Sequence, residues 1–127
     1  VFGICLGMQL MCKHSEENDT NCLNIFDVEV KKFTTAEQTL KVPQIGWNSI
    51  VNLKSPLMNN VPENSYCYFV HSYYAVLCKE TIATTNYIQP YSSALHKANF
   101  YGVQFHPEKS ATVGEQIIRN FIELPQP

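Results

Sequence analysis

Residues 1–10 read VFGICLGMQL, and in them a short apolar run reaches a cysteine with glycine two positions before it and two positions after it. We predict the end of a buried strand over residues 1–4 and a helix from Leu6 to about His14. A strand that turns sharply into a helix around such a residue is the nucleophile-elbow pattern G-x-S-x-G, with Cys5 in place of serine. This stretch therefore predicts an α/β sheet that carries a cysteine nucleophile where a strand ends.

The predicted turn sets the environment of the thiol. At the N-terminus of a helix, Cys5 would face the positive end of the helix dipole, which lowers the pKa of a thiol. The backbone N–H of Leu6 faces the same space and can donate a hydrogen bond to an oxyanion. We expect both Gly3 and Gly7 to be required, because a Cβ atom at either position would collide with the neighbouring strand or helix. The alternative is that Cys5 packs in the core beside two incidental glycines.

The stretch GVQFHPEKS at residues 102–110 supplies a candidate base for the cysteine. His106 and Glu108 are two positions apart, so their side chains project to the same side of an extended backbone, and the intervening proline keeps the histidine out of the helical region. Glu108 can then accept a hydrogen bond from one imidazole nitrogen while the other nitrogen faces Cys5. This arrangement predicts a Cys-His-Glu triad. His71, in FVHSYY, is the rival base.

Composition bounds the class of protein. The 127 residues carry a net charge of −2, with 45% hydrophobic and 16% charged residues, which predicts one globular domain over residues 1–127 and no binding of nucleic acid or membrane. No apolar stretch approaches the roughly 20 residues that span a bilayer, and no signal-peptide pattern opens the chain, so we expect a cytoplasmic protein. Five cysteines without C-x-x-C or zinc spacing disfavour a disulfide scaffold and a metal site.

The rest of the chain is expected to form strands followed by one helix. The strands are predicted over residues 25–33, 40–53, 66–76, 81–87, 92–97 and 100–106, with the first two paired. A polar loop is expected over residues 14–21 and one short helix within residues 55–64. The last element is an amphipathic helix, capped by Thr112 and Glu115 and ended by Pro125. Consecutive strands with short turns predict a mixed sheet in an α/β fold.

Four motifs, in order, resemble one family. GICLGMQ at the start and QFHPEKS about a hundred residues later resemble the class I (triad) glutamine amidotransferases. Within that family, VPQIGWN at residues 42–48 and YFVHSY at residues 68–73 resemble the glutaminase subunits of imidazole glycerol phosphate synthase, of histidine biosynthesis. The resemblance covers essentially the whole chain and implies a flavodoxin-like, three-layer α/β fold with a mixed sheet. It also implies that this chain is the C-terminal portion of the domain, whose N-terminal part supplies a second oxyanion donor.

The resemblance implies a role for each residue of the triad. L-glutamine would be hydrolysed to glutamate and ammonia through a γ-glutamyl thioester on Cys5. His106 would act as the general base and then as the acid, and Glu108 would orient it. The N–H of Leu6 would be the oxyanion donor that this chain retains. Losing the other donor costs on the order of 10²–10³ in rate, so we expect the 127 residues alone to be poorly active. The resemblance implies no cofactor and no metal.

Substrate and partner contacts follow from the same resemblance. Gln9, one helical turn after Cys5, matches a glutamine-contacting position. The implied partner is a (β/α)8-barrel cyclase, which forms a heterodimer with the glutaminase and uses the ammonia to make imidazole glycerol phosphate and aminoimidazole carboxamide ribotide. The segment implied to hold the substrate α-carboxylate is His71, Ser72 and Tyr73. The positions implied at the partner interface are Trp47, Asn48 and Lys109.

Three other functions stay open at this point. A paralogous glutaminase would share the triad but feed ammonia to another acceptor, such as a surface sugar. A Cys-His hydrolase or peptidase that delivers no ammonia is less consistent with Gln9 and FVHSYY, because it needs no glutamine pocket. A non-catalytic binding module would have no need of Cys5, His106 and Glu108 together.

Overall fold

The computed structural model describes residues 1–34 and 40–125. Within these ranges the helices are α1 (Leu6–Leu10) and α2 (Ala111–Glu123), and the short 3₁₀ helices are η1 (Glu17–Asp19), η2 (Pro56–Met58) and η3 (Pro107–Lys109). The strands are β1 (Phe2–Ile4), β2 (His14–Ser15), β3 (Thr20–Asn21), β4 (Glu29–Lys32), β5 (Gln44–Ile50), β6 (Ser65–His71), β7 (Tyr73–Ala75), β8 (Thr81–Tyr87), β9 (Gln89–Lys97) and β10 (Phe100–Val103). In the described part of the chain they form an eight-stranded sheet and a separate β5–β6 pair.

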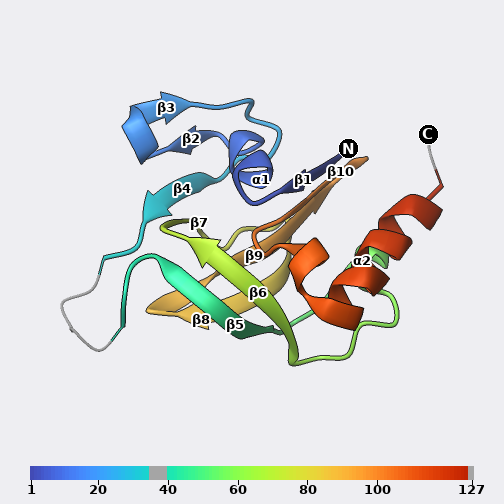
Figure 1. Ribbon diagram of the computed structural model, residues 1–127. Coiled ribbons are helices and arrows are strands. Elements are labelled where there is room, and N and C mark those ends of the chain that lie inside the picture. The colour runs from blue at the N-terminus through green and yellow to red at the C-terminus, as the bar shows by residue number, and fades with distance from the viewer. Residues whose placement is uncertain (35–39, 126–127) are drawn as a thin grey trace.

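The large sheet runs in the order β1-β10-β9-β7-β4-β2-β3, and β8 pairs with β9. β1 lies parallel to β10, with Ile4 opposite Val103, and β2 lies parallel to β4, whereas the other neighbours are antiparallel. Figure 1 shows the β5–β6 pair in front of this sheet and α1 beside β1. Because β1 and β10 run in the same direction, the residues that follow them emerge at one edge of the sheet.

Helices and the β5–β6 pair cover the two faces of the sheet. Leu95 of β9 packs in one apolar cluster with Met8 of α1. Its neighbour Ala94 packs in a second cluster with Phe69 of β6 and Ile117 of α2. Successive residues of a strand point to opposite faces, so each cluster fills one side of the sheet. The mixed, three-layer α/β arrangement predicted from the sequence is therefore present.

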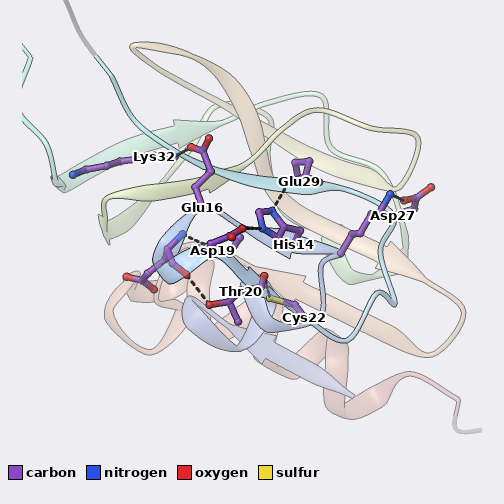
Figure 2. Close-up of polar contacts among 11 residues, drawn as sticks. His14, Glu16, Asp19, Thr20, Cys22, Asp27, Glu29 and Lys32 are labelled. Atoms are coloured by element: carbon purple, nitrogen blue, oxygen red, sulfur yellow. Dashed lines mark hydrogen bonds and ion pairs between the residues drawn. The ribbon is translucent and has the colours of Figure 1, made fainter.

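The segment at residues 14–21, predicted as a solvated loop, forms β2 and β3. Figure 2 shows His14 between two carboxylates, with Nδ1 2.9 Å from Glu29 Oε2 and Nε2 2.7 Å from Asp19 Oδ1. Hydrogen bonds to Asp19 and then Glu29 raise the pKa of His14. Glu16 Oε1 accepts a hydrogen bond from a backbone N–H of β4 at 2.8 Å. His14 and Glu16, two polar residues of the stretch that indicated a loop, thus hold this segment against β4.

The segment at residues 66–76, predicted as one strand, is two strands in different sheets. β6 pairs with β5, whereas β7 pairs with β4 and β9. The break falls at Ser72, where Nδ1 of His71 donates to Tyr73 O at 2.8 Å across the bend. The expected pairing of β4 with the segment at residues 40–53 is wrong, because β4 takes β7 as its neighbour and β5 takes β6.

The first helix is shorter than predicted. α1 ends at Leu10 rather than near His14. The N–H of Lys13 donates to Val28 O at 3.0 Å, so the chain joins the segment that leads into β4 instead of continuing the helix. A helix of this length adds little dipole at its N-terminus, which bears on the thiol that precedes it.

The last helix begins earlier than its predicted cap and is capped differently. α2 starts at Ala111, so Thr112 lies inside the helix, and the predicted capping box with Glu115 does not form. Ser110 is the N-cap residue and makes no side-chain cap bond. The helix ends two residues before Pro125, as predicted. Across residues 1–34 and 40–125, neither helix has the length and apolarity needed to cross a bilayer.

Candidate active site

Cys5 lies on the turn between β1 and α1. Its backbone has φ 55° and ψ −110°, a left-handed conformation that is strained for a residue with a side chain. Its N–H donates to Val103 O at 2.8 Å, which extends the contact between β1 and β10 by one residue before the chain turns. The sharp turn predicted from the elbow pattern is therefore present. Strain of this kind is concentrated at functional sites.

The two glycines around Cys5 are not equivalent. A Cβ atom at Gly3 would lie 2.5 Å from Met11 Cε and 2.8 Å from the carbonyl carbon of Gly7, so a side chain there would force the turn apart. A Cβ atom at Gly7 would meet no atom within 4 Å among the described residues. The expectation of a collision is thus confirmed for Gly3 and wrong for Gly7, because the space beside α1 is open at that position.

The Cys5 thiol is half-buried between β6 and the end of β10. Its Sγ donates to Val70 O at 3.8 Å and accepts from Nε2 of Gln104 at 3.6 Å. Burial raises the thiol pKa and the charge of Glu108 adds to this, whereas the Leu6 N–H and the Gln104 amide lower it. The net direction is upward. The predicted lowering by the helix dipole is wrong, because α1 has only five residues and desolvation outweighs it.

His106 and Glu108 follow β10 and so lie at the sheet edge where Cys5 follows β1. Nδ1 of His106 lies 3.0 Å from Glu108 Oε2, a hydrogen-bond distance. The backbone of His106 is held on both sides, since its N–H donates to Tyr68 O at 2.9 Å and its C=O accepts from Ser110 Oγ at 2.6 Å. The structure therefore gathers the three residues of the predicted triad at one edge and gives the histidine a fixed backbone.

His71, the rival base, is buried with both ring nitrogens occupied. Its Nδ1 donates to Tyr73 O, and its Nε2 lies 2.9 Å from Gln44 Oε1 and 3.1 Å from Tyr91 Oη. Burial lowers its pKa to about 4, so the ring is neutral at neutral pH. Both ring nitrogens are thus engaged by partners other than the thiol of Cys5. Of the two candidate bases, His106 is therefore the one that fits the predicted triad better.

The segment predicted to hold a substrate carboxylate directly follows the carbonyl that the thiol contacts. Val70 O is that carbonyl, and β6 ends one residue later at His71. The C=O of Ser72 accepts from Phe33 N at 3.0 Å, and the C=O of Tyr73 accepts from His71. The carbonyls of this bend are thus bonded within the chain, which fixes its backbone beside the thiol.

A buried glutamine that the sequence motifs did not single out lies against the thiol. Gln104, the first residue after β10, is 0% exposed, and its Oε1 accepts from Nε2 of Gln9 at 2.8 Å. Nε2 of Gln9 also donates to Tyr73 O at 3.0 Å. The available signal was a polar residue inside the apolar run GVQF, directly before the candidate base. A glutamine in that place needs a buried partner.

A small cavity of about 80 Å³ opens beside α1. Its lining includes Leu6 and Gln9 from the α1 side, and Ser15, Glu17 and Thr20 from the segment around β2 and β3. The sequence reading missed Glu17 because the polar stretch around it indicated a solvated loop. A larger hollow of about 440 Å³ lies at the start of β1, and none of the predicted site residues lines it.

Of the three predicted interface residues, two lie on β5 and one lies on η3. Trp47 is 53% exposed, and its ring meets that of Tyr68 edge-on with centroids 5.9 Å apart. Asn48 is bonded within the chain, since its Nδ2 donates to Asn86 O at 3.0 Å. Lys109 is exposed at the end of η3. Trp47 and Lys109 are therefore available at the surface, whereas Asn48 ties β5 to β8.

Comparison with known proteins gives one consistent family. Residues 1–124 match the family described as glutamine amidotransferase class-I. The imidazole glycerol phosphate synthase subunit HisH of Bacteroides thetaiotaomicron is 56% identical over 124 residues, which cover 98% of this chain and 63% of that protein. The subunit of the same name from Blochmanniella floridana is 53% identical over 124 residues, with 96% and 62% covered. The chain thus spans less than two thirds of the length of these curated relatives.

Solved structures share the fold. A glutamine amidotransferase from Thermotoga maritima gives a TM-score of 0.61 at 20% identity, covering 96% of this chain and 44% of that one. A second glutamine amidotransferase gives a TM-score of 0.63 at 15% identity, covering 96% and 58%. At such identities the likeness shows the fold alone, and it confirms the flavodoxin-like α/β architecture. With a family match over residues 1–124 and the motifs' residues gathered at one sheet edge, the chain belongs to the class-I glutamine amidotransferase family.

Proposed function

We propose that this chain belongs to the glutaminase subunit of an imidazole glycerol phosphate synthase, which hydrolyses L-glutamine to glutamate and ammonia. The observation that carries the proposal is a cysteine on a strained turn at the sheet edge where the hydrogen-bonded pair of His106 and Glu108 also lies. The choice of this synthase is supported by relatives at 53% and 56% identity that are HisH subunits of imidazole glycerol phosphate synthase.

The first half of the reaction releases ammonia. Because Glu108 holds Nδ1 of His106, the other ring nitrogen, Nε2, takes the proton from Cys5 Sγ. The thiolate attacks the side-chain carbonyl carbon of glutamine, and the Leu6 N–H donates to the oxygen that becomes negative. The C–N bond then breaks as His106 returns the proton to the departing nitrogen. The products are ammonia and a γ-glutamyl thioester on Cys5.

The second half restores the enzyme. A water molecule gives a proton to His106 and attacks the thioester carbonyl carbon. The C–S bond breaks, glutamate leaves, and His106 returns the proton to the sulfur of Cys5. Both halves are acyl transfers accompanied by proton transfers, with no gain or loss of electrons, so the mechanism as written requires neither a cofactor nor a metal.

The substrate is proposed to lie across the turn that carries Cys5. Gln9 and Glu17 line the cavity beside α1, and a carboxylate such as that of Glu17 is suited to the α-ammonium of an amino acid. The bend from His71 through Ser72 to Tyr73 follows the Val70 carbonyl at the thiol, and is proposed to face the α-carboxylate. Opposite charges at the two ends would orient the amino acid so that its amide reaches the sulfur.

The partner is proposed to be a (β/α)8-barrel cyclase, in a cytoplasmic heterodimer. Three large apolar side chains are exposed on the outer face of the β5–β6 pair: Ile45 at 64%, Trp47 at 53% and Tyr66 at 60%. An apolar group of this kind with a polar surround is typical of a protein interface. Lys109 next to the triad extends the proposed contact surface, and Asn48 supports it from β5. Because β6 also contacts the thiol, ammonia would form close to this face.

The test measures glutamate release by the purified full-length protein, alone and with its barrel cyclase and the cyclase's phosphoribosyl ligand. We expect activity that rises on adding the cyclase, and a smaller rise in Trp47→Ala with unchanged activity in the absence of the cyclase. No glutamate release under either condition would contradict the glutaminase proposal. Activity that ignores the cyclase but rises with a sugar amidotransferase would instead indicate the paralogous enzyme.

A further inference from the structure

A row of buried amides runs from the substrate side of α1 to the sulfur of Cys5. Gln9 Nε2 donates to Tyr73 O at 3.0 Å and to Gln104 Oε1 at 2.8 Å. Gln104 Nε2 then lies 3.6 Å from Cys5 Sγ. Gln104 is 0% exposed and Gln9 is 6% exposed, so water does not compete for these bonds.

The orientation of both amides is fixed by one backbone atom. The carbonyl of Tyr73 can only accept a hydrogen bond, so the atom of Gln9 that meets it is the NH₂ group. The same NH₂ group meets Gln104, which must therefore offer its oxygen. The NH₂ group of Gln104 is left to face the sulfur of Cys5. The orientation of this N–H donor toward the thiol is thus set by hydrogen bonds within the protein.

We propose that Gln104 is a positioning residue of the glutaminase reaction: its amide N–H groups stabilise the Cys5 thiolate while its carbonyl oxygen holds the side chain of Gln9 at the cavity. The inference rests on the proposed function, because only a reacting Cys5 gives this donor a role. A hydrogen bond to a charged acceptor is stronger than one to a neutral acceptor, so the Gln104 N–H favours the thiolate over the thiol. It opposes two effects at the same sulfur, burial and the charge of Glu108.

Two variants of Gln104 distinguish the effects of its hydrogen bond to Cys5 and its hydrogen bond to Gln9. Gln104→Glu keeps the shape and the oxygen that accepts from Gln9, but replaces the donor to sulfur with a carboxylate oxygen. Gln104→Leu removes both bonds. The matched control is Gln116→Leu on α2, which removes a glutamine bonded to Asn120.

The measurement is the rate of alkylation of Cys5 by iodoacetamide in the full-length protein, followed by mass spectrometry over a range of pH. At about pH 8 we expect both Gln104 variants to react about threefold to tenfold more slowly than the wild type, with the midpoint moved to higher pH, and Gln116→Leu to match the wild type. With glutamine as substrate, kcat falls in both Gln104 variants, whereas KM rises only in Gln104→Leu. A pH midpoint that is the same in wild type and in both folded variants would overturn the proposal.

A measurement on the wild type covers the case in which the variants do not fold. In an NMR titration, the side-chain amide of Gln104 should shift with the same midpoint as Cys5 alkylation, and an amide that stays constant across that midpoint would overturn the proposal. Neither alkylation nor this titration uses glutamine. A protein that shows both effects but releases no glutamate would therefore refute the glutaminase function and leave the Gln104–Cys5 bond standing.

Discussion

Cys67 and His71 lie inside β6, whereas Cys5 and His106 lie at the edge of the large sheet, so two regions of the molecule each hold a cysteine and a histidine. In the interior, Cys67 is 0% exposed and burial raises its pKa to about 12, while burial lowers the pKa of His71 to about 4. At the edge, Cys5 is half-buried on a strained turn, and His106 has a carboxylate on one ring nitrogen. The same residue types thus serve packing in one place and fit catalysis in the other.

The difference comes from where each residue sits on its strand. Alternation along β6 turns Cys67 and His71 toward the core, where desolvation disfavours the thiolate and the imidazolium alike. Cys5 and His106 come after their strands end, where backbone groups and solvent remain within reach. The comparison teaches that a strand end, rather than the presence of a cysteine and a histidine, makes a site of this kind.

The largest effect expected from this comparison is the loss of activity on removing the edge thiol. Cys5→Ala should lower kcat by at least about 10⁴-fold, because no other group can form the thioester. The matched variant Cys67→Ala should keep kcat within about twofold and lose about 1–2 kcal/mol of unfolding free energy through the cavity it leaves. Steady-state kinetics and denaturant melts of the two variants measure this. Equal losses of activity would remove the distinction between the regions.

The next effect concerns the base. His106→Asn should lower kcat by about 10²- to 10³-fold, because proton transfer to and from sulfur and nitrogen then lacks its carrier. His96→Asn is the control, since His96 bonds to Ser55 and Ala98 on β9 and its surroundings rather than at the thiol. The rates of the two variants, His106→Asn and His96→Asn, are compared by single-turnover kinetics. An unchanged rate in His106→Asn would assign the base elsewhere.

A smaller effect is a pH dependence of stability that originates in the interior. The pKa of His71 is about 4 when folded and near 6.5 when unfolded, so between these values the unfolded chain binds more protons. Its contribution to stability is present above about pH 6.5 and is lost as pH falls toward 4, to the extent of about 3 kcal/mol. Urea melts of wild type and His71→Asn should converge over that window. Parallel curves would show that His71 does not titrate there.

The pH dependence of stability contributed by His14 has the opposite sign to that contributed by His71. Its pKa is raised by Asp19 and then Glu29, so the stabilisation from the charged ring is present below about pH 6.5 and is lost as pH rises through the raised pKa.

The smallest effects separate the two glycines of the turn. Gly3→Ala should cost about 1–3 kcal/mol of unfolding free energy, because its Cβ meets Met11 and the backbone of Gly7. Gly7→Ala should raise stability by up to about 1 kcal/mol, since alanine is the better residue inside α1 and the space there is open. Thermal melts of the two variants give the sign directly. A destabilised Gly7→Ala would restore the collision expected from the motif.

The features of the site that could be predicted from the sequence are those that depend on the spacing of neighbouring residues. The turn at Cys5 is predicted from G-I-C-L-G, and the bond between His106 and Glu108 is predicted from their spacing, although Glu108 lies in η3 and not on the expected extended backbone. These stretches share an edge because two strands about a hundred residues apart pair in parallel, which no local pattern predicts.

Other features depend on packing that no local pattern encodes. Gln104 faces Cys5 only because Tyr73 O, from another strand, fixes the amides between them. The pKa of the Cys5 thiol is raised mainly by burial, which depends on the whole fold and which an argument from the local helix dipole does not include. Residues 14–21 form β2 and β3, and the bonds that hold them to β4 run from His14 to Glu29 and from the Lys32 N–H to Glu16, contacts that composition alone does not show.

The most direct test of the catalytic site uses diazo-oxo-norleucine, an electrophilic analogue of glutamine, with the full-length protein and peptide mass spectrometry. Because Cys5 lies on a strained turn at the sheet edge that also carries His106 and Glu108, we predict a single adduct on Cys5 that excess glutamine prevents and that is absent from Cys5→Ala. The contradicting result would be an unlabelled Cys5, or labelling spread over the remaining thiols, Cys12, Cys22, Cys67 and Cys78.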